Sequence, residues 1–290
     1  MTTKRRQKPL TELQNTPLWT AIITPLEHDL SLDLESFETM LKEQEEAGNG
    51  VVILGSTGEG LNLDEEEKKE IVRFTSALAL EIPVMVGIGG FHQKSTLNWL
   101  DFLEAQKNLD AYLLVTPLYA KPGYYGQYHW FETLLDQSSR PCMLYNVPGR
   151  TGVALNHQTV QDLNKHPQFW AIKEASGSVE EFKRYKEDAP KQQLFSGDDA
   201  LTPDFAPHGA NGLVSVSANV WPKATRRFVE LCLSGELSDE DRNMWLEASK
   251  TLFLASNPVP TKALLFSLGR LKSPNLKAPL DADDLHDIEP

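Results

Sequence analysis

Eight short apolar runs alternate with longer amphipathic stretches along this chain, and that alternation leaves few possible folds. Short apolar runs are typical of strands buried on both faces, and parallel strands of this kind are connected by helices. Eight such units in sequence predict an α/β fold, the closed (β/α)8 or TIM barrel. An open doubly wound sheet is the alternative, but the glycine-rich dinucleotide fingerprint expected after its first strand is missing. The predicted strands are residues 19–24, 51–54, 84–87, 111–115, 142–145, 170–173, 193–196 and 212–216.

The segments between these strands carry helical patterns. In residues 33–47, for instance, Leu34, Phe37 and Leu41 lie on one face, and Asp64 is placed to cap a helix over residues 64–80. Three more helical patterns follow the eighth strand, at residues 221–233, 238–255 and 259–268.

The last two of these helices exceed what a barrel needs. We therefore expect a C-terminal helical extension whose apolar faces cover the barrel or meet another subunit, followed by a tail over residues 272–290 that ends in a short turn. The predicted organisation is an N-terminal tail (1–18), a catalytic barrel (19–235) and a C-terminal helical extension (236–290).

Charge and composition exclude several classes of protein. The net charge of −13 argues against a nucleic-acid partner, because phosphate binding needs a basic face. No apolar run is long enough to span a membrane, and no apolar segment follows the basic residues near the start, as a signal peptide would require. Cys142 and Cys232 are too few for a disulfide framework or a zinc cluster. We therefore expect a cytoplasmic protein.

Lys173 stands at the end of the sixth predicted strand, directly after Trp170, Ala171 and Ile172. In an α/β barrel, the carboxyl ends of the strands carry the catalytic groups. A lysine among apolar neighbours there could supply the free amine that a Schiff-base nucleophile needs. The alternative is a strand-end lysine that reaches for water or pairs with Glu174.

Three loops after other strands carry further candidates. Ser56 and Thr57 lie between glycines after strand two, where backbone amides and two hydroxyls could bind a carboxylate or pass a proton, although a plain glycine turn fits equally. Tyr145 ends the fifth strand, so it should lie beside Lys173. Arg150 follows it and could clamp a carboxylate, or form a surface ion pair. After strand seven, the Asp pair at 198–199 suggests a metal, but a helix N-cap fits better.

These segments together resemble the dihydrodipicolinate synthase family of pyruvate-dependent class I aldolases, which includes N-acetylneuraminate lyase. The resemblance runs from about Thr20 to about Gly269. It rests on Gly-Ser-Thr-Gly-Glu at 55–59, Tyr-Asn-Val-Pro-Gly-Arg-Thr-Gly at 145–152, Ile-Lys-Glu-Ala-Ser-Gly at 172–177, Ser-Gly-Asp-Asp at 196–199 and Asn-Pro-Val-Pro-Thr-Lys at 257–262.

The resemblance implies a lyase of lysine and diaminopimelate biosynthesis that condenses pyruvate with L-aspartate 4-semialdehyde. Lys173 would form an imine with pyruvate, whose enamine adds to the aldehyde. Tyr145 would be the general acid and base, in a proton relay with Thr57 and with Tyr119 of a neighbouring subunit. No metal or organic cofactor is implied, because the imine is itself the electron sink.

The resemblance also implies the substrate contacts and the assembly. The amides of Ser56 and Thr57 would hold the pyruvate carboxylate, and Gly197 and Val214 would line the pocket. Arg150 would receive the carboxylate of the semialdehyde. The assembly would be a homotetramer, a dimer of dimers in which Tyr119 acts across the dimer interface.

Two departures leave alternatives open. The synthases usually have threonine where Ser56 stands, and serine is the residue of the lyases. Another pyruvate-dependent aldolase, such as N-acetylneuraminate lyase or a 2-keto-3-deoxy sugar acid aldolase, therefore stays open, as does a non-catalytic keto-acid-binding barrel.

The second departure concerns regulation. Lysine-inhibited members hold lysine with a polar set of side chains, and the matching positions here are mostly apolar or small. We therefore expect weak or absent lysine feedback, which inhibition at sub-millimolar lysine would contradict. These positions are Gly60, Leu61, Glu65, Phe91, Ser95 and Leu118.

Overall fold

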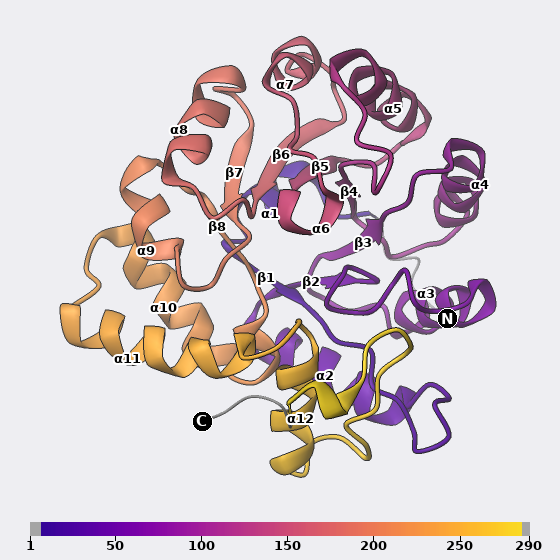
Figure 1. Cartoon of the computed structure of the whole chain (residues 1–290), viewed down its shortest axis with the longest axis vertical. Helices are drawn as coiled ribbons and strands as arrows, with labels where there is room; N and C mark the ends of the chain where they lie inside the picture. The colour runs from indigo at the N-terminus through magenta and orange to yellow at the C-terminus, as the bar shows by residue number, and fades with distance from the viewer. Residues whose placement is uncertain (1–6, 286–290) are drawn as a thin grey trace.

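The computed structural model describes residues 7–285 and forms a closed barrel of eight parallel strands in sequence order. β1 pairs with both β2 and β8, which closes the ring seen in Figure 1. The predicted (β/α)8 barrel is confirmed. Its strands are β1 (Leu18–Ala21), β2 (Gly50–Ile53), β3 (Val84–Ile88), β4 (Ala111–Val115), β5 (Cys142–Asn146), β6 (Phe169–Glu174), β7 (Gln193–Ser196) and β8 (Gly212–Ser215).

Helices surround the ring, and several begin at a residue whose side chain caps the first turn. Asp64 caps α3 as predicted, in a reciprocal capping box with Glu67, and Asp33 caps α2 by accepting from the Ser36 amide. The helices are α1 (Leu10–Gln14), α2 (Leu34–Ala47), α3 (Glu65–Leu78), α4 (Gln93–Glu104), α5 (Tyr124–Gln137), α6 (Pro148–Thr151), α7 (His157–Leu163), α8 (Val179–Asp188), α9 (Thr202–Phe205), α10 (Pro222–Ser234), α11 (Asp239–Lys250) and α12 (Val259–Ser267).

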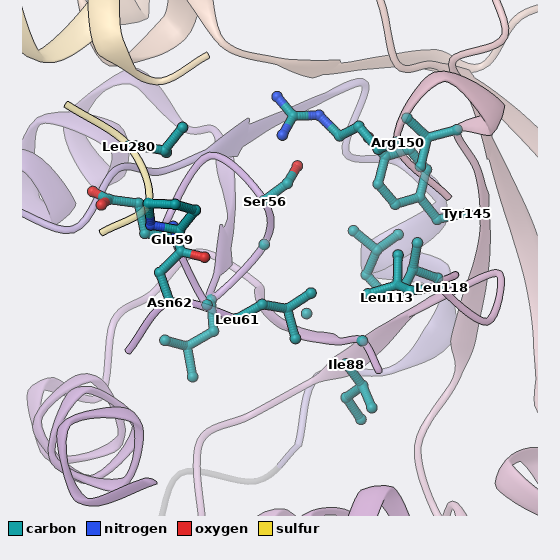
Figure 2. Close-up of a pocket in the computed structure, with 18 residues that line it drawn as sticks. Ser56, Glu59, Leu61, Asn62, Ile88, Leu113, Leu118, Tyr145, Arg150 and Leu280 are labelled. Atoms are coloured by element: carbon teal, nitrogen blue, oxygen red, sulfur yellow. The ribbon is translucent and has the colours of Figure 1, made fainter. Parts of the chain in front are cut away.

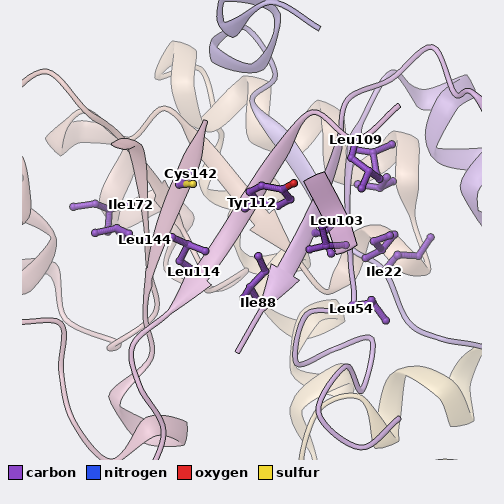
Figure 3. Close-up of a cluster of buried hydrophobic side chains, with 14 of the residues drawn as sticks. Ile22, Leu54, Ile88, Leu103, Leu109, Tyr112, Leu114, Cys142, Leu144 and Ile172 are labelled. Atoms are coloured by element: carbon purple, nitrogen blue, oxygen red, sulfur yellow. The ribbon is translucent and has the colours of Figure 1, made fainter. Parts of the chain in front are cut away.

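Apolar side chains pack on both sides of the strands. The larger cluster lies between the barrel and the helices, and Figure 3 shows part of it, with Tyr112 and Leu114 on β4 beside Leu144 on β5. A second cluster fills the barrel interior, where Trp19 lies 6.3 Å from Trp170 between ring centroids. The barrel is therefore a packed core, and any substrate must bind at one of its ends.

Two predicted strands end earlier than the sequence pattern indicates, because distant side chains replace the neighbouring strand as hydrogen-bond partners. β1 ends at Ala21, and the amide of Ile23 donates to Oδ1 of Asn219 at 3.0 Å. β8 ends at Ser215, and the amide of Val216 donates to Oδ2 of Asp199 at 2.9 Å. The polar partners turn the chain away from the sheet.

The segment predicted as an N-terminal tail contains a helix. In α1, Leu13 is fully buried in the interior cluster, and the carbonyl of Gln14 accepts from Gln193 at the first residue of β7. The helix therefore closes the amino end of the barrel. Residues 1–6 lie outside the described residues.

The C-terminal extension packs on the barrel. Trp245 of α11 stacks on Phe228 of α10 at 4.1 Å between centroids, and Leu265 of α12 is buried in the outer cluster. α11 ends at Lys250, before a 3-10 turn at Thr251–Phe253, so the helix predicted over 238–255 is shorter than expected. The described part of the tail contains a 3-10 turn at Ala282–Leu285, and the predicted end of the tail, at residues 286–290, lies outside the described residues. No helix in residues 7–285 is long and apolar enough to cross a membrane.

Candidate active site

Lys173 and Tyr145 lie side by side at the carboxyl ends of β6 and β5. The two residues are paired in register, and Lys173 Nζ lies 4.3 Å from the centroid of the Tyr145 ring. Both side chains are almost completely buried, with 5% and 7% exposed. The predicted adjacency is therefore confirmed.

Lys173 does not pair with Glu174, which was the alternative for this strand end. The carboxylate of Glu174 accepts from Nδ2 of Asn146 and from the amide of Ser176, each at 2.6 Å. Burial raises the pKa of Glu174, an effect that these hydrogen bonds oppose. Among residues 7–285, Lys173 has no carboxylate within ion-pair distance, so its amine is left for another partner.

Gly197 leaves the room that the lysine side chain occupies. A Cβ atom at this position would lie 2.9 Å from Cε of Lys173 and 2.7 Å from Cβ of Ala175. Val214, at 1% exposed, belongs to the interior cluster that also contains Tyr145. Gly197 is thus packed against Lys173, and Val214 shares the interior cluster with Tyr145.

The β2 loop (residues 55–60) brings Ser56 and Thr57 to the same end of the barrel. Leu54 leaves the strand in a left-handed conformation with φ of 55°, and Glu59 repeats it at 54°. The amide of Gly60 donates to the Gly55 carbonyl at 3.1 Å, which closes the loop. The loop is thus a tight turn, in which the left-handed residues are Leu54 and Glu59 and not glycines.

Asn257 links Thr57 to Arg150, and the sequence analysis did not identify it as a site residue. Its Nδ2 donates to Oγ1 of Thr57 at 2.8 Å, and its carbonyl accepts from Arg150 at 3.0 Å. Asn257 precedes α12, 200 residues from Thr57 in sequence. It is the first residue of the Asn-Pro-Val-Pro-Thr-Lys segment, which contributes to the family resemblance. The local pattern of that segment does not indicate that Asn257 reaches the site.

A cavity of about 290 Å³ opens beside these residues. Figure 2 shows Ser56 on one side of this cavity, Arg150 and Tyr145 on another, and apolar residues below them. The lining includes neither Lys173 nor Thr57, which lie deeper. The lining is Leu54, Gly55, Ser56, Glu59, Gly60, Leu61, Asn62, Gly87, Ile88, Gly89, Leu113, Val115, Leu118, Tyr145, Val147, Arg150, Pro279 and Leu280.

Tyr119 is a predicted site residue whose side chain lies exposed on the surface of the chain and does not line the cavity. It follows β4, has φ of 61°, and its side chain is 86% exposed. Its backbone amide donates to the Thr151 carbonyl at 3.3 Å, which holds the backbone of the exposed residue near α6.

The two aspartates after β7 accept hydrogen bonds from backbone amides and from a serine hydroxyl. Asp199 is fully buried and accepts from Ser215 Oγ at 2.5 Å and from the Val216 amide, and burial raises its pKa. Asp198 accepts from the amides of Ala200 and Leu201 at 2.9 and 3.3 Å, one turn before α9. Among residues 7–285, no three His, Cys, Asp or Glu side chains are grouped to hold a metal ion.

Comparison of the sequence and the fold with known proteins points to one family. A sequence model described as "Dihydrodipicolinate synthetase family" matches residues 14–286. The 4-hydroxy-tetrahydrodipicolinate synthase of Francisella tularensis subsp. novicida is 47% identical over 274 residues, 94% of this chain and 92% of the relative.

Solved structures agree. The dihydrodipicolinate synthase of Acinetobacter baumannii complexed with pyruvate is 30% identical with a TM-score of 0.85, over 92% of each chain. A monomeric dihydrodipicolinate synthase variant is also 30% identical, with a TM-score of 0.87 over 95% of this chain and 96% of that one.

Proposed function

Because this chain belongs to the dihydrodipicolinate synthetase family, we propose that the residues at its barrel end carry out the synthase reaction through an imine on Lys173. The chain is a lyase of lysine and diaminopimelate biosynthesis. It condenses pyruvate with L-aspartate 4-semialdehyde to give 4-hydroxy-tetrahydrodipicolinate. The observation that carries the residue-level proposal is the buried Lys173 amine over the Tyr145 ring, with no carboxylate partner in the described chain.

The amine of Lys173 attacks the ketone carbon of pyruvate, water leaves, and an imine forms. Loss of a proton from the pyruvate methyl group gives an enamine, whose terminal carbon bonds to the aldehyde carbon of the semialdehyde. The amino group of the semialdehyde then displaces the lysine by transimination as the ring closes. Each stage needs proton transfer next to the imine, and Tyr145 is the group in position for it.

Thr57 is proposed to connect Tyr145 to a proton source. A threonine hydroxyl has one hydrogen to donate and can also accept. Because Asn257 already donates to Thr57 Oγ1, the threonine hydrogen is left for another acceptor, and we assign the Tyr145 hydroxyl to that place. The amides of Ser56 and Thr57 hold the pyruvate carboxylate, with Gly197 and Val214 beside it.

Arg150 is proposed to select the acceptor by binding its carboxylate. The side chain lines the cavity near Tyr145, and its hydrogen bond to the Asn257 carbonyl leaves other N–H groups to form a fork with a carboxylate. Arg150→Gln should raise the KM for the semialdehyde by about 10- to 100-fold, the loss expected for a charge-assisted hydrogen bond, with the KM for pyruvate unchanged.

Steady-state kinetics with each substrate varied in turn measures this effect. Arg227→Gln, at an exposed arginine on α10, is the matched control. Equal KM values in the two variants would remove Arg150 from acceptor binding. Wild-type turnover of N-acetylmannosamine with pyruvate, and none with the semialdehyde, would favour the alternative aldolase.

Tyr119 is proposed to complete the site of a neighbouring subunit. Its side chain is 86% exposed on a left-handed turn and does not line the cavity of its own chain, so a second copy would have to receive it. A dimer is the smallest assembly that allows this, and the dimer of dimers stays a prediction. Tyr119→Phe should lower kcat by about 10²-fold, as for loss of a general acid or base, and leave folding unchanged.

Complementation separates action across an interface from action within one chain. Co-expression of Tyr119→Phe with Lys173→Ala chains gives mixed dimers in which one site has both an intact lysine and an intact tyrosine. Activity well above either parent variant is expected. Unchanged kcat in Tyr119→Phe, or no recovery in the mixture, would contradict the proposal; Tyr125→Phe, at another exposed tyrosine, is the control.

A further inference from the structure

The C-terminal segment after α12 returns across the barrel end and lies on the β2 loop. Lys277 is bound there on three sides. Its amide donates to Oε2 of Glu59 at 2.6 Å, its carbonyl accepts from Asn62 at 3.4 Å, and its Nζ pairs with Glu67 of α3. The segment is therefore anchored to the loop that carries Ser56 and Thr57.

A buried ion pair also ties the β2 loop to α12. Nζ of Lys262, on α12, lies 2.5 Å from Oε1 of Glu59, and both side chains are almost fully buried. The same amine donates to the Asn275 carbonyl at 2.9 Å. The carboxylate of Glu59 thus bridges α12 and the C-terminal segment, and holds both at the edge of the cavity.

The anchored segment supplies one side of the cavity. Pro279 and Leu280 are the lining residues that come from the C-terminal segment. In Figure 2, Leu280 lies beside Glu59 and faces the space that Ser56, Arg150 and Tyr145 border on their sides. Leu280 is half-buried and lines the cavity.

We infer that Leu280 is a specificity-determining wall of the acceptor site, which makes the flank opposite Arg150 apolar and selects short aldehydes with one anionic end. This inference rests on the proposed function, since it assigns Arg150 to the acceptor carboxylate. An acceptor held by Arg150 at one end presents its other flank to Leu280, whose side chain has no hydrogen-bonding group. A long polyhydroxylated aldehyde would have to leave hydroxyl groups unpaired against this side chain, which is unfavourable.

Two substitutions at Leu280 test the wall. Leu280→Ala removes the contact, and Leu280→Asn keeps the size of the side chain but makes it polar. Both should raise the KM for L-aspartate 4-semialdehyde by about fivefold, the effect of losing part of a buried leucine side chain, with the KM for pyruvate unchanged. Leu268→Ala, at an exposed leucine following α12 that does not line the cavity, is the matched control and should leave both values unchanged.

The possible outcomes separate the wall from the proposed function. If the wild type is active and Leu280→Ala, Leu280→Asn and Leu268→Ala all have its kinetics, the wall is contradicted and the proposed function is not. A parallel rise in the KM for pyruvate would also overturn it, because the effect would then concern the whole site. Wild-type protein that traps pyruvate on Lys173 but makes no product from the semialdehyde would instead contradict the proposed function, and with it the wall.

Discussion

Replacing Lys173 with alanine should abolish condensation, with kcat falling by about 10⁴-fold or more, because the amine that forms the imine is lost. Among the residues that line the cavity, none has a side-chain amine. The fold should persist, since alanine removes one side chain next to Gly197 and adds no volume. Product formation from pyruvate and L-aspartate 4-semialdehyde is the measurement.

Borohydride trapping shows whether the loss is chemical. Wild-type protein incubated with pyruvate and borohydride should gain the mass of one reduced adduct per chain on the peptide containing Lys173, and the alanine variant should gain none. Lys165→Ala, at an exposed lysine before the same strand, is the control and should behave as wild type. Condensation that survives in Lys173→Ala, or an adduct on another lysine, would contradict the assignment.

The position of this nucleophile could be predicted from sequence because the relevant information is local. A run of apolar residues that ends in Lys173 predicts a buried strand and where it stops, and a second strand that ends in Tyr145 predicts the neighbour. Parallel strands align their carboxyl ends, so the two patterns together place both side chains at one edge. The register in the structure has this arrangement.

Contacts between distant segments could not be predicted in the same way. Asn257 lies 200 residues from Thr57, and Lys277 lies 218 residues from Glu59, yet each pair is within hydrogen-bond distance. No periodicity in either segment indicates which distant side chain it will meet. Asn219 illustrates the same limit. Its side chain accepts from the amide of Ile23, just after the end of β1 and 196 residues away in sequence.

The ion pair between Glu59 and Lys262 has a second large expected effect, on stability. Lys262→Met should lower the free energy of unfolding by about 3–5 kcal/mol, because the buried carboxylate of Glu59 would lose its ion-pair partner. Burial lowers the pKa of Lys262, and the carboxylate of Glu59 counteracts that shift. Urea unfolding followed by circular dichroism measures the change.

A double substitution distinguishes the loss of a partner from the loss of the lysine itself. Glu59→Gln combined with Lys262→Met leaves no unpaired charge, so it should recover much of the stability lost in the single variant. Lys250→Met removes a lysine from an exposed pair with Glu247 and should cost no more than about 1 kcal/mol. A single Lys262→Met variant as stable as Lys250→Met would show that the buried pair contributes little.

The same substitution links stability to activity. The carboxylate of Glu59 belongs to the loop that carries Ser56 and Thr57, and it also accepts from the Lys277 amide. Once Lys262 is gone, the loop loses its ion pair with α12 and the C-terminal segment loses the hydrogen bond at Asn275, so Lys262→Met should raise the KM for both substrates under conditions where the protein is still folded. Leu280→Ala should affect the semialdehyde alone. The contrast between a loss shared by both substrates and a loss confined to one therefore separates the anchor of the site from its wall.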